Sequence, residues 1–276
     1  MEIKEAVEIF EKYGIKATVN DNKIIISHYT QPKEKTFSEL GINEDELIEN
    51  VYACADVFDA RKSKLTTFPL AASREIRLYE DNEITEMPEL KVAGIFVLNK
   101  KVKKLPKLKF VSSIQLDESP IKSLPKLKEA GIFIAQNSEL KDLPVLETVS
   151  KLCVVDCPLE DLKNLQNAGD VFLCSSDENN KMDIKSLNKL EEVEKIFVAN
   201  ANIKTIPQLK KADKIAFYNC AIKSVKKSIC KDVEIANKIS DEELSEKFDT
   251  FTDWYNSDVL QKSMDVLGDL VNKINS

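Results

Sequence analysis

The sequence predicts an α/β solenoid, a stack of short coils that share one parallel sheet and one continuous apolar core. A Leu-Pro-x-Leu-Lys motif recurs along the chain, and its prolines at 69, 88, 106, 125 and 144 are 19, 18, 19 and 19 residues apart. A short apolar run typical of a strand precedes each motif. One coil of this size cannot bury its apolar face alone, so the fixed period indicates stacked repeats.

Length and composition fit one continuous core. Of the 276 residues, 43% are apolar and 32% are charged, and no apolar run approaches the roughly 18 residues of a membrane span. The first residues, MEIKEAVEIFEKYG, mix acids into an amphipathic pattern and do not resemble a secretory signal. We therefore expect a soluble protein without membrane contact. The six cysteines could pair in principle, but without an export signal we expect a reducing, cytoplasmic compartment.

Charge is distributed unevenly along the chain. The net charge is −8 over residues 1–90, +7 over 91–233 and −6 over 234–276, which gives −7 for the whole. An acidic chain argues against a dedicated binder of duplex DNA, although a local basic face stays open.

Both ends of the chain lie outside the repeat. Residues 1–50 predict a small α/β cap, with a helix up to Tyr13, a hairpin around Asn20–Lys23 and two further helix starts near Thr36 and Asn43. Residues 238–276 predict a helical cap, because Ser240 precedes a run of acids in the manner of an N-cap. Within it, the spacing over 259–274 predicts a final helix, and Trp254 and Tyr255 are expected to close the last coil.

Residues 51–237 form the predicted array of coils. We place the strand cores near 57, 76, 95, 114, 132, 152, 171, 196, 215 and 233, with the residues at offsets 0 and +2 pointing inward. The residue at +7 begins an inward-facing return path, and the proline after leucine favours an extended or single-turn return over a helix. The inward residues of the return are Val102, Ile121, Leu159, Ile203 and Ile222, followed by the leucines of the motif.

The segments LKVAGIFVLNKKVKKLPKLK, LKEAGIFIAQNSELKDLP and LQNAGDVFLCSS resemble the short leucine-rich repeats of bacteria and bacteriophages. The resemblance covers about residues 55–237 and implies a leucine-rich-repeat-like array of about nine or ten 19-residue coils. It is specific for fold and weak for function, because this fold is mostly a scaffold. The usual asparagine ladder after the strand is broken, since Ser119, Cys157, Ala201 and Cys220 stand in it.

The sequence offers little for catalysis. The only histidine, His28, lies in the predicted hairpin, far from any cysteine or acid cluster, and no glycine-rich phosphate loop is visible. Cys153 and Cys157 do not have a convincing metal-ligand spacing. We therefore expect no enzyme activity, no cofactor and no metal.

A stripe of apolar side chains is the strongest functional signal. Offsets +1 and +3 are expected to face the concave side of the sheet, where adjacent strands would join these residues into one exposed patch of the kind that marks an interface. Two alternatives stay open: a strand frame that is wrong by one residue, or a terminal segment that folds over the patch. The predicted partner-binding residues are Tyr79, Phe96, Leu98, Phe133, Val155, Phe172, Phe197 and Tyr218.

A second row is basic. The residue after the +7 position is lysine in six coils, which predicts either a rim that attracts acidic surfaces and phosphates or a solvated edge that keeps the array soluble. These residues are Lys103, Lys122, Lys141, Lys185, Lys204 and Lys223.

Together these features predict a non-enzymatic scaffold that docks on another protein through the stripe. The resemblance suggests a bacterial or phage effector or inhibitor that occludes a partner's surface. The alternative is a protein that binds single-stranded nucleic acid, or a nucleic-acid-processing defence enzyme, through the aromatic residues and the lysine row. The chain is expected to be a monomer or a homo-oligomer that uses the stripe.

Overall fold

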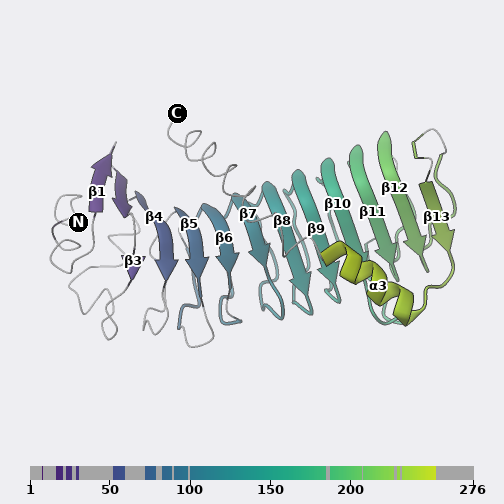
Figure 1. Cartoon of the computed structure of the whole chain (residues 1–276), viewed down its shortest axis with the longest axis horizontal. Coiled ribbons are helices and arrows are strands. Elements are labelled where there is room, and N and C mark those ends of the chain that lie inside the picture. The colour runs from purple at the N-terminus through teal and green to yellow at the C-terminus, as the bar shows by residue number, and fades with distance from the viewer. Residues whose placement is uncertain are drawn as a thin grey trace.

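The computed structural model describes residues 8, 17–20, 23–26, 29–30, 52–59, 72–78, 83–88, 90–98, 100–184, 187–206, 208–226, 229–230 and 232–252. It is a β-solenoid, an elongated stack of coils along a single sheet (Figure 1). The parallel strands recur about every 19 residues, as the period predicts. The only α-helix among the described elements is α3 (Asp241–Thr252).

The sheet runs in the order of the chain from one end to the other. Strands β4 to β13 are each parallel to the next, since every coil returns the chain to the same edge before the following strand begins. Their bounds are β4 Tyr52–Asp59, β5 Ala72–Arg77, β6 Val92–Val97, β7 Phe110–Gln115, β8 Glu129–Gln136, β9 Thr148–Val155, β10 Asn167–Cys174, β11 Glu192–Ala199, β12 Lys211–Tyr218 and β13 Asp232–Ala236.

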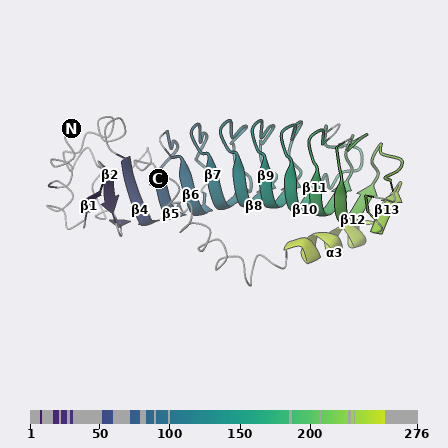
Figure 2. The same cartoon turned by 90° about the horizontal axis from the view of Figure 1, so that it is seen from above.

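The return segments cover one face of the sheet and close the core (Figure 2). They are extended, and main-chain hydrogen bonds join them from coil to coil, as from Lys109 N to Lys91 O at 2.8 Å and from Lys128 N to Lys109 O at 2.9 Å. The predicted inward residues of the return are buried: Val102, Ile121, Leu159, Ile203 and Ile222. The leucines of the motif are buried as well, which confirms the inward face of the return path.

The strand frame is wrong by one residue in β4, β6 and β8, and in β4 Phe58, not Val57, stands in register with Ile76. Phe96 pairs in register with Ile114, and Phe133 pairs with Ile114 and Leu152, so both phenylalanines belong to the inner row that faces the return segments. Both are at most 1% exposed and lie in the main core. The prediction placed Ile95 and Ile132 inward instead, because two adjacent apolar residues leave the alternation of a strand undecided.

A signal for the correct frame exists in the sequence. The inner residue follows the glycine of each Ala-Gly pair by two positions: Phe96 after Gly94, Phe133 after Gly131 and Val171 after Gly169. In the third case the intervening residue is the polar Asp170, which settles the alternation. Aligning the coils on glycine therefore yields the frame that aligning them on the first apolar residue misses.

The broken asparagine ladder is replaced by hydroxyls and thiols that bond to the main chain. The Cys157 thiol donates to Ala135 O at 3.4 Å and lies 3.2 Å from the Ser138 hydroxyl, and the Cys220 thiol donates to Val198 O at 3.5 Å. Preceding residues turn the chain with φ near 50°, a conformation that asparagine and aspartate tolerate well. They are Glu118, Asn137, Asp156, Asn200 and Asn219.

The connection from β10 to β11 contains a polar segment, residues 175–181, that is hydrogen-bonded to the following coils. Asn200 Nδ2 donates to Ser175 O at 2.7 Å, and the Lys181 ammonium donates to the main-chain and side-chain oxygens of Asn219 at 2.9 and 2.7 Å. The loop therefore spans the following coils and does not project freely from them.

Both terminal segments contribute described elements. Strands β1 (Ala17–Asn20) and β2 (Lys23–Ile26) form the predicted antiparallel hairpin, and β2 and the short β3 (Tyr29–Thr30) pair with β4. The predicted helix start at Ser240 is also confirmed, since the Ser240 hydroxyl accepts from Glu243 N at 3.2 Å. Of the helix predicted before Gly14, only Glu8 is described, and it is helical. The helix starts near Thr36 and Asn43 and everything beyond Thr252 lie outside the described residues.

Helix α3 lies along the face of the sheet that points away from the return segments (Figures 1 and 2). At the end of the array, Ile235 on the inner row of β13 remains 37% exposed. Among the described helical residues, no helix is long and apolar enough to span a membrane.

Candidate functional site: the outer face of the sheet

The outer face is the side of the sheet opposite the return segments. Side chains one and three positions after the inner residue point to it, and the register aligns them in two rows across the strands. One row contains Gln115, Ile134, Cys153, Phe172, Phe197, Ala216 and Glu234. The other contains Gln136, Val155, Cys174, Ala199, Tyr218 and Ala236.

Apolar residues dominate both rows from β8 to β12. They form a second core cluster, separate from the main core between the sheet and the returns. An outward row on a solenoid sheet is ordinarily solvated and polar, because only the inner row is needed for the core. The apolar outer rows therefore indicate a surface built for contact.

Three aromatic rings form the centre of this face, one from each of β10, β11 and β12. Phe172 and Phe197 stack with ring centroids 4.6 Å apart and planes 6° apart, and Tyr218 follows 5.4 Å from Phe197. A fourth ring comes from the helix, since Phe248 of α3 meets Phe172 edge-on at 5.7 Å. We call Phe172, Phe197 and Tyr218 the aromatic row.

Helix α3 covers the aromatic row with a small apolar contact. Leu244 and Phe248, four residues apart and so on one face of the helix, pack against the outer cluster together with Ile239. Full burial of two such side chains stabilises by roughly 3–6 kcal/mol, and both remain partly exposed. The aromatic row itself is deeply buried, with Phe172 and Tyr218 1% exposed and Phe197 8%.

A groove of about 370 Å³ opens beside the helix, over β9 and β10. Side chains of the sheet and of α3 line it, and most of them are apolar: Val155, Phe172, Cys174, Ser176, Leu244, Ser245 and Phe248. Val155 is only partly buried, so the apolar surface continues past the edge of α3.

Burial keeps the two thiols and the phenol of this face neutral. It raises the pKa of the Cys153 and Cys174 thiols to about 12 each, with smaller contributions from nearby carboxylates. Burial also raises the pKa of the Tyr218 hydroxyl, and the carboxylates of Glu234 and Glu243 raise it further. These thiols are therefore protonated at neutral pH and are poor nucleophiles.

A second groove, of about 510 Å³, lies at the amino ends of β9 to β12. Its floor contains the small residues Ser150 and Gly169, and its walls are charged. The Lys151 ammonium and the Asp170 carboxylate stand 3.9 Å apart within it. The outer face thus changes from charged at the amino ends of the strands to apolar at their carboxyl ends.

The structure divides the predicted partner-binding residues into two groups. Phe172, Phe197, Tyr218 and Val155 lie on the outer side of the sheet, as predicted, but the three rings are buried, so their expected exposure is wrong and only Val155 is partly exposed. Phe96, Phe133 and Leu98 pack with the main core, so for these three the expectation of an exposed side chain is wrong. Tyr79 lies outside the described residues. Sequence reasoning missed Ile132 and Ile134, which belong to the outer cluster because the frame of β8 is shifted by one residue.

The predicted lysine rim is exposed wherever the structure describes it, at Lys103, Lys122, Lys141, Lys204 and Lys223. Lys185 lies outside the described residues. The Lys122 ammonium is 3.5 Å from the carboxylate of Glu139, so acids partly neutralise the rim.

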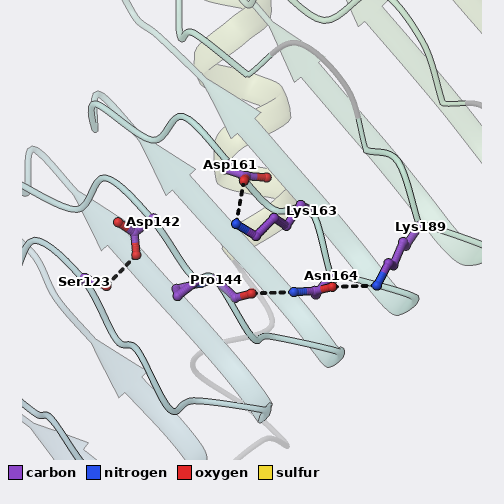
Figure 3. Close-up of polar contacts among 7 residues, drawn as sticks. All are labelled: Ser123, Asp142, Pro144, Asp161, Lys163, Asn164 and Lys189. Atoms are coloured by element: carbon purple, nitrogen blue, oxygen red, sulfur yellow. Dashed lines mark hydrogen bonds and ion pairs between the residues drawn. The ribbon is translucent and has the colours of Figure 1, made fainter.

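The return side carries polar side chains that pair with one another across coils (Figure 3). The Ser123 hydroxyl donates to the Asp142 carboxylate, Asn164 Nδ2 donates to Pro144 O at 2.5 Å, and the Lys189 ammonium donates to Asn164 Oδ1 at 2.7 Å. These hydrogen bonds join neighbouring return segments. The polar residues at these positions therefore have a structural role that needs no ligand.

Within the described ranges, no group of three or more histidine, cysteine or acidic side chains is arranged to hold a metal ion. His28 lies outside those ranges. The cysteine side chains that the structure describes, at 153, 157, 174, 220 and 230, all carry free thiols.

Comparison of the chain with protein-family models, with curated proteins and with solved structures finds no match.

Proposed function

We propose that this chain is a non-enzymatic protein-binding scaffold that docks on its partner through the apolar outer face. The observation that carries the proposal is the second core cluster, which places apolar side chains on the side of the sheet that the solenoid core does not need. Helix α3 packs against these side chains, and the apolar face continues to the partly buried Val155. Apolar rows on the outer side of a repeat protein are characteristic of an interaction site.

The open groove beside α3 is the accessible part of that face. Val155 lies at its edge and is only partly buried, and the side chains around it are mainly apolar. A partner's apolar side chain would find there a preformed pocket with Phe172 at its base. Such central, desolvated pockets supply most of the affinity of protein interfaces.

The finer architecture belongs to the same proposal. We assign the chain to the leucine-rich-repeat type, with about nine or ten coils, an N-terminal α/β cap over 1–50 and a C-terminal helical cap over 238–276. The resemblance of the repeats to those of bacteria and bacteriophages supports a role as a cytoplasmic effector or inhibitor that occludes a partner surface.

Substitution of Val155 tests this function. Val155→Glu places a charge in the open groove, and Lys126→Glu places the same side chain on the exposed return side as a matched control. Both variants and the wild type serve as bait in the native host, with captured proteins quantified by mass spectrometry. We expect one specific partner to fall at least about tenfold with Val155→Glu and to persist with Lys126→Glu, since about 1.4 kcal/mol of lost binding energy suffices. Equal capture by all three baits would contradict the proposal.

Single-stranded nucleic acid is the second candidate ligand, because the described lysines of the rim are exposed. The rings of the aromatic row lie beneath α3 and do not present bare faces for base stacking, so we rank this function lower. Titration with a labelled oligonucleotide at two salt concentrations separates the two, because phosphate contacts weaken steeply as salt rises.

A further inference from the structure

Helix α3 and the aromatic row differ in how firmly each is held. The aromatic row stands on three paired strands, in which Phe172 is in register with Phe197 and Tyr218 is in register with Ala199, two residues after Phe197. Helix α3 contributes Leu244 and Phe248, both still partly exposed, from a segment with five acidic residues and one lysine. The sheet therefore provides a rigid, preformed site, and the helix is a shallow occupant of it.

The geometry of the contact is that of a helix in a groove. Two apolar side chains four residues apart insert toward the aromatic row, and Glu242, Ser245 and Glu246 remain exposed on α3. Recognition of this type depends on apolar anchors at i and i+4 and tolerates wide variation on the other face. A helix from another chain with the same spacing would meet the same surface.

We propose that the aromatic row is a helix-binding site, that α3 is its intramolecular occupant, and that the partner contributes an amphipathic helix with two large apolar residues four positions apart. This inference deepens the proposed function and rests on it for the biological partner. Ser240, the N-cap residue of α3, stands only four residues after Ala236, where β13 ends. A tether this short keeps α3 at a high effective concentration, so the partner helix must displace it.

A peptide with the sequence of residues 240–252 tests the site without knowledge of the partner. The labelled peptide is titrated against the full-length wild type, against the double variant Leu244→Ser/Phe248→Ser, in which α3 is released, and against Glu242→Ser as a matched control on the exposed side of α3. Fluorescence anisotropy reports binding. We expect the released variant to bind the peptide at least about tenfold more tightly than the wild type and the control do, because its own α3 no longer occupies the aromatic row.

Two further measurements complete the test. Adding Phe172→Ser to the released variant should abolish peptide binding, and the circular-dichroism spectrum of the released variant should keep its strand signal. Equal peptide binding by wild type and released variant, absence of binding to a folded released variant, or loss of the strand signal on release would each overturn the proposal. If the peptide binds as expected but Val155→Glu leaves capture unchanged, the helix site stands and the proposed docking surface is wrong.

Discussion

Leu124 shows how one residue type specifies this fold. It is fully buried in the return segment, and Lys122, two residues earlier, is exposed. The motif places one leucine at this point in each central coil, and Leu105 and Leu143 are buried at the equivalent positions. The core therefore depends on a side chain that the period repeats, not on a single special contact.

Leu124→Ala should lower the free energy of unfolding by about 2–5 kcal/mol, because it removes buried methyl groups and leaves a cavity. Lys122→Ala should change it by no more than about 0.5 kcal/mol. Denaturant melts of both variants measure the difference. Comparable losses would show that the return path is not packed as described.

At the scale of the element, the amino end of the strand depends on glycine. In β8 and β10 the glycine of the Ala-Gly pair lies against the preceding strand, so that a Cβ atom on Gly131 would stand 2.4 Å from Ser112 O and one on Gly169 would stand 2.3 Å from Ser150 O. Real Cβ atoms do not approach a carbonyl oxygen so closely, and the opposing atom is main chain that cannot move alone. Close approach of two backbones is what glycine permits here.

Gly169→Ala should therefore destabilise the protein by about 1–3 kcal/mol, as an overpacked site does. Ser150→Ala is the matched control, since it occupies the equivalent position of β9 and already carries a Cβ atom. Thermal melts of the two variants give the comparison. If Gly169→Ala melted no lower than Ser150→Ala, the close approach of β9 and β10 would be incorrect.

At the scale of the whole molecule, the buried thiols of the outer cluster make the free energy of unfolding fall as the pH rises through the alkaline range. The folded chain holds Cys153 and Cys174 protonated up to about pH 12, whereas an exposed thiol ionises near 9.0. Between these values the folded state binds more protons than the unfolded state, so stability falls as pH rises. Below pH 9.0, the ordinary pKa of a thiol, the thiols are protonated in both the folded and the unfolded state, and this contribution to stability is fully present.

Cys153→Ala should remove part of this dependence. Between pH 9 and 11 the free energy of unfolding of the wild type should fall more steeply than that of the variant, by about 1.4 kcal/mol per pH unit for the one thiol. Val154→Ala, its buried neighbour, should lower stability by a similar amount at every pH and keep the slope of the wild type. Urea melts across this pH range provide the slopes, and parallel slopes for wild type and Cys153→Ala would refute the burial of this thiol.

Much of the molecule follows from local and periodic signals in the sequence. The recurrence of Leu-Pro-x-Leu determines the solenoid and the inward face of the return, because every coil must bury the same side chains against its neighbours. The turn residues 20–23 and the N-cap Ser240 act within a few positions of the chain, and both predictions are confirmed. Such signals need no knowledge of distant contacts.

Only the tertiary structure decided which surface is free. Phe96 and Phe133 each follow an isoleucine, so the local pattern fits two frames, and the pairing with neighbouring strands selects the one that buries the rings. Phe172 and Phe197 do point outward, but α3 lies over them. No residue near either ring in the sequence predicts that a helix beginning at Asp241 will pack there. The covering of the aromatic row depends on packing between segments far apart in the chain. The energy of such packing cannot be predicted from any local stretch of sequence.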